Sequence, residues 1–343
     1  MIAGYHLPAY LNYPDKFKLN AICDIRPEAL EKFGEKAGVK ERYTDFLEML
    51  EKADIDAVDI CTIHDQHEAQ VVAAAKAGKQ IFLEKPMGTN LKQCNNMVEA
   101  ARKAGVAFMV GHDLRYMPHT LAIKRIIESG ELGQVRMTRC VLIDNMPPAG
   151  FMNGHWLNDP KRSGGGMMIS GIIHQVDLLR YFIGDVKTVY AVNRSIHEGY
   201  WDGREEYACA VLEFENGTIC DIMLIGSSTR SPIGCQYTLY GDEGTIMSTQ
   251  AESRVYQFGQ GMIASKKRGN FIETFNYFAP IPPERGNLPT DDAFTNEILH
   301  FADCVSEHKE PLTSGRDNLG TVKVIFGIYE SFKTGKKIDL AKM

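Results

Sequence analysis

Short apolar strands alternate with amphipathic helices in the first third of this chain. The apolar runs are KLNAICD (18–24), DAVDICT (56–62), QIFLE (80–84) and VAFMVG (106–111), with a weaker candidate strand at Glu41–Tyr43. Helical periodicity lies between them, over 27–38, 46–53, 67–78 and 90–105. Strands that are apolar almost throughout are typical of a parallel sheet buried on both faces, with helices as right-handed crossovers. The pattern therefore predicts a doubly wound, Rossmann-like α/β domain over residues 1–114.

The order of predicted elements is different in the rest of the chain. A helix is expected over 119–131, strands without intervening helices follow from 186 to 258, and helices over 291–308 and 316–333 close the chain. Asn216-Gly217 lies between two of these strands, and this dipeptide is a strong hairpin signal. We therefore predict an α+β domain over residues 115–343, with a large, mostly antiparallel open sheet and helices on one face.

Composition excludes several classes of protein. The chain has 343 residues and a net charge of −6, which argues against a protein that neutralises nucleic-acid phosphates. It has no apolar run of the length that a membrane span needs. Its eight cysteines are scattered and include no C-x-x-C pair, so we expect buried thiols rather than disulfides or a metal site. No signal peptide is visible at the start, and we expect a cytoplasmic protein.

Asp24 ends the first apolar run, immediately before a predicted helix. In dinucleotide-binding folds an acidic residue at this strand end binds the ribose hydroxyls and repels a 2′-phosphate, which favours NAD. Arg26 keeps NADP open, because a nearby guanidinium can accept that phosphate. Taken alone, an aspartate in this place is more often a helix cap.

The glycine-rich turn that should precede Asp24 is not recognisable in full. The start, MIAGYHLPAYLNY, resembles the end of such a turn and its helix, with Ala3 at the third glycine position. We expect the first strand and the first two glycines to lie upstream of Met1. A literal G-x-G-x-x-A occurs at Gly259, Gly261 and Ala264, but no sufficiently long helix follows it. We predict that this second match does not bind phosphate.

Three motifs carry chemistry. Thr62, His64 and His67 follow a buried strand, and Glu84-Lys85-Pro86 ends the next one. Ligands bind at the carboxyl ends of such strands, and a lysine held there can stabilise a developing alkoxide. As a bare tripeptide, Glu-Lys-Pro is also a common surface turn.

The third motif follows a run of three glycines. Ser170, His174 and Asp177 have the spacing i, i+4 and i+7, which places them on one face of an α-helix. A polar stripe on an otherwise apolar helix should face a cleft or find buried partners. For an isolated motif of this kind, a core histidine with satisfied hydrogen bonds is the commoner outcome.

Seven segments in order resemble the glucose–fructose oxidoreductase/inositol dehydrogenase (Gfo/Idh/MocA) family. They are HLPAYL, AICDIRPEA, CTIHDQHEA, AGKQIFLEKPMG, VGHDLRYMP, the SGGG…H…DLLRYFIG helix and YGDEGTI. The resemblance implies an NAD(P)-dependent oxidoreductase that transfers a hydride between nicotinamide and a carbinol carbon of a sugar, cyclitol or related polyol. It also implies a homodimer or homotetramer formed through the C-terminal sheet.

The same resemblance assigns roles to individual residues. Lys85 is implied as the catalytic lysine, His174 as the general acid/base, and Ser170 as its neighbour in the catalytic group. The implied cofactor-binding residues are Ala3, Asp24, Arg26, Thr62, Ile63, His64, His67, Glu84, Lys85 and His112. The implied substrate-binding residues are Lys85, Arg115, Trp156, Asp159 and His174. No metal ligand is implied.

The chain departs from the family pattern at two further positions. Ile63 stands where proline is usual, and Ser170 stands where many members have aspartate four residues before the histidine. Loss of that carboxylate removes a charge that favours a protonated His174. Two other functions stay open. One is an NAD-dependent glycoside hydrolase of the same family, and the other is a non-catalytic nucleotide- or sugar-binding regulator.

Overall fold

A computed structural model describes most of the chain. It covers residues 2–143, 155–195, 205–226, 235–250, 258–269, 273–276 and 292–343. The chain divides into two compact units, of which unit 1 is Met1–Tyr116 with Pro289–Leu319 and unit 2 is Met117–Leu288 with Gly320–Met343. Compared with the expected division at 114/115, the main difference is that segment 289–319 packs with unit 1. As functional domains, 1–114 and 115–343 stay a prediction.

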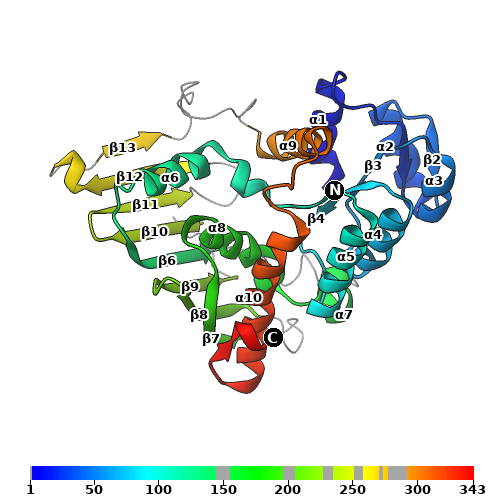
Figure 1. The fold of residues 1–343 in the computed structure, drawn as a ribbon. Helices are drawn as coiled ribbons and strands as arrows, with labels where there is room; N and C mark the ends of the chain where they lie inside the picture. The colour runs from blue at the N-terminus through cyan, green and yellow to red at the C-terminus, as the bar shows by residue number, and fades with distance from the viewer. Residues whose placement is uncertain are drawn as a thin grey trace. The chain divides into compact units, whose positions relative to one another are not determined.

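Parallel strands form the centre of unit 1 (Figure 1). β1 (Ala21–Cys23) pairs with β2 (Glu41–Tyr43), while β3 (Ala57–Ile60), β4 (Gln80–Glu84) and β5 (Phe108–Gly111) form a second sheet in the order β3-β4-β5. The helices between them are α2 (Pro27–Ala37), α3 (Phe46–Lys52), α4 (His67–Lys76) and α5 (Leu91–Ala104). The predicted alternation is confirmed. Within the described part of the chain, the β1-β2 and β3-β4-β5 sheets are separate.

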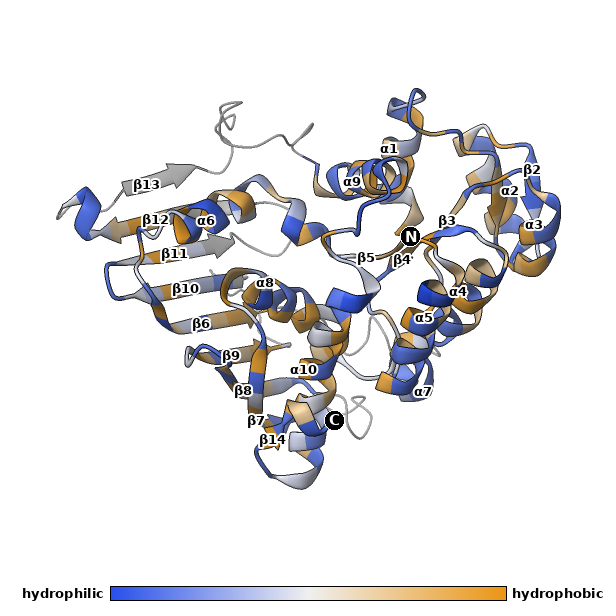
Figure 2. Ribbon diagram, in the orientation of Figure 1, coloured by the Kyte–Doolittle hydropathy of each residue, from blue (hydrophilic) through white to orange (hydrophobic). Residues whose placement is uncertain are grey.

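Local signals set the helix ends in unit 1. Asp45 caps α3 by accepting a hydrogen bond from the Glu48 N–H, and Asn90 caps α5 in the same way. Gly105 ends α5 at φ 68°, in the left-handed region that glycine adopts without a steric penalty. In Figure 2 both α4 and α5 show hydrophilic and hydrophobic bands, as expected for helices with one face on a sheet.

Two more helices complete unit 1, one from each end of its sequence. α1 (Ala3–Asn12) and α9 (Ala293–Glu307) contribute to one hydrophobic cluster with β4 and β5. Ala9, Phe82, Met109 and Ile298 are its most buried members. α9 thus matches the helix predicted over 291–308, of which residue 291 lies outside the described residues.

Unit 2 contains a nine-stranded sheet in its described residues. The strands are β6 (Val135–Ile143), β7 (Val186–Arg194), β8 (Tyr207–Phe214), β9 (Ile219–Ile225), β10 (Cys235–Gly241), β11 (Gly244–Gln250), β12 (Phe258–Ser265), β13 (Glu273–Asn276) and β14 (Ile338–Asp339). Their order is β13-β12-β11-β10-β6-β9-β8-β7-β14, and only the β6–β9 pair is parallel. The predicted mostly antiparallel sheet is confirmed.

Two sequence signals in this sheet behave as predicted. β8 and β9 form an antiparallel hairpin around Asn216 and Gly217, with Gly217 at φ 85°. The G-x-G-x-x-A match at 259–264 lies inside β12, so it is extended strand and not a phosphate-binding turn. Most of the strand expected near 253–258 lies outside the described residues.

Helices cover one face of the large sheet. They are α6 (Pro118–Glu128), α8 (Ile173–Ile183) and the part of α10 (Gly315–Thr334) from residue 320 onward, as Figure 1 shows, and unit 2 also has the short α7 (Pro160–Ser163). Along β8, buried residues alternate with more exposed ones, as one covered and one open face require. Among the described residues, no helix combines the length and apolarity that crossing a membrane would need.

Candidate active site

Lys85 lies at the carboxyl end of β4, in unit 1. The Lys85-Pro86 peptide bond is cis, and the Lys85 N–H donates a 3.1 Å hydrogen bond to Oε2 of Glu84. Glu84 is only 6 % exposed, whereas Lys85 is half-buried. The backbone of the lysine is therefore held by a buried carboxylate while its long side chain starts at the sheet edge.

His67 ties the next loop to this edge. Its Nδ1 lies 2.9 Å from the Pro86 carbonyl oxygen and its Nε2 lies 3.2 Å from the Thr62 carbonyl oxygen. Burial lowers the pKa of His67, and the two carbonyls only partly offset this, so the ring is neutral at pH 7. A neutral imidazole donates one hydrogen bond, and the shorter contact assigns it to Pro86. His67 thus positions the residues after β3 and β4.

The remaining residues predicted after β3 lie in a short helical turn. Ile63 is extended and precedes the 3₁₀ turn His64–Gln66, in which His64 is 7 % exposed. Thr62 donates from its hydroxyl to Oε1 of Gln70 at 2.6 Å. Ala3 is the first residue of α1.

Asp24 follows β1 and is fixed by Arg26. Its carboxylate accepts hydrogen bonds from the backbone N–H and from Nε and Nη2 of Arg26, at 2.9 to 3.2 Å. Burial opposes the effect, but these bonds hold the pKa of Asp24 below its usual value. With 35 % of its side chain exposed, the carboxylate is ionised and accessible to a hydroxyl donor.

His112 and Arg115 follow β5 and are almost fully buried, at 1 % and 3 % exposure. Nε2 of His112 accepts from the Asn318 amide at 2.6 Å, because that amide nitrogen can only donate. Arg115 donates to Oδ2 of Asp317 at 2.8 Å and to the Leu312 carbonyl at 3.3 Å. Both side chains connect the end of β5 to the second chain segment of unit 1.

In unit 2 the glycine run leads into a π-helical turn, Met168–Ile172, before α8 begins at Ile173. The assumption of a continuous α-helix through Ser170 was therefore wrong in this turn. Ser170 donates from its hydroxyl to the Gly166 carbonyl at 2.8 Å, and His174 is half-buried at the second position of α8. π-turns inside helices occur frequently at functional sites.

Asp177 does not face an open cleft. It is 1 % exposed and accepts a 3.1 Å hydrogen bond from the hydroxyl of Thr321 on α10. The stripe of polar residues thus has a buried, hydrogen-bonded member, as the simpler interpretation of this motif allowed.

Two residues that sequence reasoning missed hold the glycine run. Glu205 accepts hydrogen bonds from the Met168 N–H and from the Tyr329 hydroxyl, and that hydroxyl accepts from the Gly166 N–H. A carboxylate in this place satisfies one of the open N–H groups at a helix start and interacts favourably with the helix dipole. A Cβ at Gly165 would lie 2.2 Å from the Tyr329 hydroxyl oxygen, so glycine is required by this close approach. In the sequence, the glycine run was the signal that another group packs closely here, but it did not indicate that this group is Tyr329.

The loop implied to lie near the substrate is only partly described. Trp156 lies in a 3₁₀ turn and its ring stacks on His155 at 5.9 Å. Asp159 caps α7 by accepting from the Lys161 N–H at 2.9 Å. Residues 144–154 of this loop lie outside the described residues.

Comparison with known proteins covers both units. Residues 1–112 match a family described as "Oxidoreductase family, NAD-binding Rossmann fold", and residues 120–247 match the "GFO/IDH/MocA C-terminal domain". The chain belongs to the GFO/IDH/MocA oxidoreductase family. The predicted family and its NAD-binding character are confirmed.

Relatives in the GFO/IDH/MocA family cover nearly the whole chain. The myo-inositol 2-dehydrogenase of Thermotoga maritima is 27% identical over 335 residues, which is 95% of this chain and 92% of the relative. The scyllo-inositol 2-dehydrogenase (NAD(+)) of Bacillus subtilis is 28% identical over 98% of this chain and 92% of the relative. Levoglucosan dehydrogenase in complex with NADH has a similar fold, with a TM-score of 0.86 at 20% identity over 99% of this chain and 96% of that one.

The residues of unit 1 fit the NAD cofactor of the GFO/IDH/MocA family. An ionised, partly exposed Asp24 offers acceptors for ribose hydroxyls, and Thr62, His64 and Lys85 all follow carboxyl ends of strands in the β3-β4-β5 sheet. His67 supports this edge through a buried hydrogen bond to the Pro86 carbonyl, and Glu84 supports it through a part-buried one from the Lys85 N–H.

Proposed function

We propose that this protein oxidises a carbinol carbon of a sugar, cyclitol or related polyol, with NAD⁺ as hydride acceptor, and catalyses the reverse reduction. The observation that carries the proposal is Lys85, whose backbone is fixed by Glu84 at the edge of an NAD-binding sheet. The relatives named myo-inositol and scyllo-inositol 2-dehydrogenase support a cyclic polyol as substrate.

Lys85 and His174 are proposed to divide the proton chemistry. The Lys85 ammonium group donates a hydrogen bond to the substrate oxygen and stabilises its developing negative charge. His174 takes the hydroxyl proton on its imidazole and returns it in the reverse direction. The nicotinamide supplies the hydride chemistry itself, while these side chains orient the substrate and move the proton. Ser170 is proposed to modulate His174 as its neighbour one turn earlier.

The cofactor would be held along the strand ends of unit 1. Asp24 with Arg26 is proposed to bind the adenosine ribose, and Thr62, Ile63 and His64 to line the nucleotide. Ala3 and His112 are proposed as further contacts, and His67 and Glu84 as residues that position this lining. Arg115, Trp156 and Asp159 are proposed to bind the substrate. Asp317 fixes the guanidinium of Arg115, and the Lys161 N–H fixes the carboxylate of Asp159.

We further propose that the open face of the unit 2 sheet joins a second copy of the chain. Tyr240, Met137 and Ile219 are paired across three adjacent strands and are 43 %, 43 % and 47 % exposed. Tyr190 and Val211 form a second exposed apolar pair on β7 and β8, two residues along the strands from that row, because Ile219 itself pairs with Glu213. Exposed apolar side chains grouped on one sheet face are typical of a protein interface. A homodimer or homotetramer covers it.

A cytoplasmic location is proposed from the thiols. No disulfide joins the seven cysteines that the structure describes, and Cys94, Cys140 and Cys220 are fully buried in the core. Unpaired cysteines of this kind are ordinary in a reducing compartment.

The test is a panel of polyols assayed with NAD⁺ and NADP⁺. We expect NADH formation at 340 nm with at least one cyclitol or sugar, and a preference for NAD⁺ because Asp24 repels a 2′-phosphate. Aryl glycosides are included as well, because release of the aryl group without net NADH would instead assign glycoside hydrolysis. Tight NADH binding without turnover of any substrate would assign a regulator and contradict the proposal.

A further inference from the structure

Unit 1 contains a buried group of metal-ligand-type atoms, and of its residues Glu84 alone has a part in the proposed function. His6 on α1, Glu84 at the end of β4 and Glu297 on α9 each place one such atom within 4.8 Å of the others. These residues are 0 %, 6 % and 0 % exposed. The rings of Phe82 and Phe294 flank the His6 ring, at centroid distances of 5.5 and 5.6 Å.

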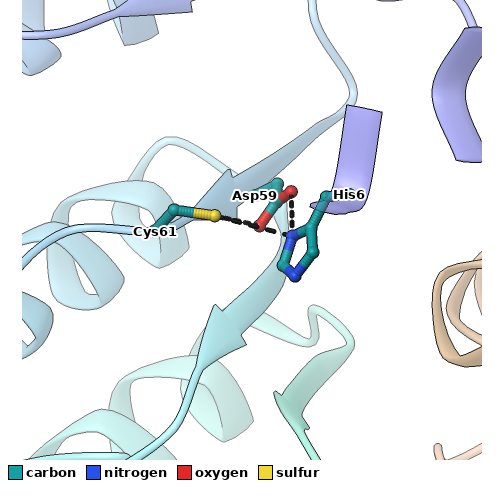
Figure 3. Close-up of side chains that lie close together, drawn as sticks. All are labelled: His6, Asp59 and Cys61. Atoms are coloured by element: carbon teal, nitrogen blue, oxygen red, sulfur yellow. Dashed lines mark hydrogen bonds and ion pairs between the residues drawn. The ribbon is translucent and has the colours of Figure 1, made fainter. Parts of the chain in front are cut away.

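His6 is oriented from its other side by Asp59. Nδ1 of His6 lies 2.8 Å from Oδ2 of Asp59, which also accepts from the Tyr10 hydroxyl at 2.8 Å. The Cys61 thiol donates to Oδ1 of Asp59 at 3.2 Å. Figure 3 shows His6, Asp59 and Cys61 together. The proton of Nδ1 therefore points to Asp59, and Nε2 points to Glu84 Oε1 at 3.1 Å. Histidines that bind metals almost always donate their second ring N–H to a carboxylate or carbonyl in this way.

The carboxylate of Glu297 lacks hydrogen-bond donors in this group. Among the described residues, neither of its carboxylate oxygens has a hydrogen-bond partner, although the residue is 0 % exposed. Burying a carboxylate without a partner is costly. A protonated imidazole could bridge Asp59 and Glu84, but this leaves Glu297 unsatisfied. A cation between the three acceptors satisfies all of them at once.

We propose that His6, Glu84 and Glu297 bind one divalent transition-metal ion. One imidazole nitrogen with carboxylate oxygens suits Zn²⁺ or Mn²⁺ better than Mg²⁺ or Ca²⁺, which prefer oxygen ligands only. Bonds of about 2.0–2.2 Å require the carboxylates to move slightly inward. The second possible set, His6 with Asp59 and Cys61, already forms its own hydrogen bonds and serves as the outer support.

The ion would connect three separate parts of unit 1. α1 and α9 come from its two chain segments, and Glu84 lies between them at the end of β4. Because Glu84 also accepts from the Lys85 N–H, the metal would fix the backbone beside the proposed catalytic lysine. Its role is structural and positioning, and the ion does not need to contact the substrate.

The test measures metal content and heat stability of the full chain without a histidine tag. After dialysis against a chelator, the protein is titrated with Zn²⁺, Mn²⁺ or Mg²⁺, and bound metal is measured by mass spectrometry. We expect about one equivalent of Zn²⁺ or Mn²⁺ and a rise in melting temperature of about 5 °C, with little effect of Mg²⁺. Pulsed EPR of the Mn²⁺ form should show coupling to one imidazole nitrogen.

Variants distinguish this site from adventitious binding. Glu297→Gln should weaken metal binding about 100-fold or more, and Asp59→Asn about 10-fold to 100-fold through the His6 ring. Glu307→Gln is the matched control, because Glu307 lies on the same helix with 55 % of its side chain exposed. Failure of the wild-type protein to bind Zn²⁺ or Mn²⁺, or Mn²⁺ binding without nitrogen coupling, overturns the proposal and assigns protons to the cluster. Unchanged binding by a folded Glu297→Gln protein overturns it too.

Discussion

The two units satisfy their buried carboxylates in different ways. In unit 2, Glu205 accepts from a hydroxyl and a backbone N–H, and Asp177 accepts from the Thr321 hydroxyl. In unit 1, Glu84 shares one imidazole with Asp59, and Glu297 has no hydrogen-bond partner among the described residues. Each of these unit 2 carboxylates thus has a neutral donor on at least one oxygen, whereas neither oxygen of Glu297 has one among the described residues.

Buried carboxylates with enough donors and buried carboxylates with too few donors have different consequences for the protein. A buried carboxylate with neutral donors stabilises one conformation and needs nothing further. A cluster with too few donors must take up a proton or a cation, and it therefore responds to conditions. We infer that ordinary hydrogen bonds at Met168 and Asp177 fix the helical segment that carries His174, whereas the cluster behind Lys85 depends on the proton or ion that it binds.

The largest expected effect comes from the lysine itself. Lys85→Met keeps the length of the side chain and removes the ammonium group that stabilises the alkoxide. We expect kcat to fall about 10³-fold to 10⁴-fold, with NADH binding changed little, because the loss is in the transition state. Steady-state rates and NADH fluorescence titration measure the two effects. Lys92→Met, at an exposed position of α5, is the control, and a Lys85→Met enzyme within threefold of wild type would show that Lys85 is not catalytic.

The second effect tests the other half of the proposed pair. His174→Asn removes the group that takes the substrate proton but keeps a polar side chain at the second position of α8. We expect kcat to fall about 10²-fold to 10³-fold and the pH dependence assigned to the imidazole to disappear. Exposed His308, replaced by Asn, provides the control. If the pH–rate profile of His174→Asn keeps its wild-type shape, another group is the base.

Local signals made the fold predictable. The apolar runs before Asp24 and Lys85, the helix periodicities and the Asn216-Gly217 turn all act over a few residues, and each gives the expected element. Family resemblance added the order of the domains. Nothing local to α9 indicates which sheet it packs against, so the sequence did not indicate that segment 289–319 belongs to the compact unit 1.

The site was less predictable because its contacts are distant in sequence. His6 and Glu84 are 78 positions apart and Met168 and Glu205 are 37 apart, so no spacing rule connects them. The π-turn at Ser170 follows a glycine run that is held by Tyr329, 163 positions from Gly166. Strand ends and glycines indicated where polar contacts form, but the partners depend on tertiary packing.

A smaller effect is expected from the hydrogen bonds of Tyr329 that hold the glycine run in unit 2. Tyr329→Phe removes the hydroxyl that donates to Glu205 and accepts from the Gly166 N–H. The free energy of unfolding should fall by about 1–3 kcal/mol, because a buried carboxylate and a buried N–H each lose a partner. Urea unfolding followed by circular dichroism measures this loss. Tyr43→Phe, which removes a hydroxyl that donates an exposed hydrogen bond to Glu41, should change the unfolding free energy by less than about 0.5 kcal/mol. Equal effects of the two changes would contradict the stabilising role given to the Tyr329 hydroxyl bonds in unit 2.

The smallest effect concerns the pH profile and needs the finest measurement. Ser170→Asp places a carboxylate four residues before His174, and a negative charge favours the protonated imidazole. For substrate oxidation the neutral ring is the base, so activity at low pH should fall and the acidic limb of kcat/KM should move to higher pH. Ser170→Asn, which adds a similar volume without charge, should leave that limb in place. If the pH profiles of Ser170→Asp and Ser170→Asn coincide, a charge at residue 170 does not act on the imidazole of His174. The π-turn then directs the two side chains apart.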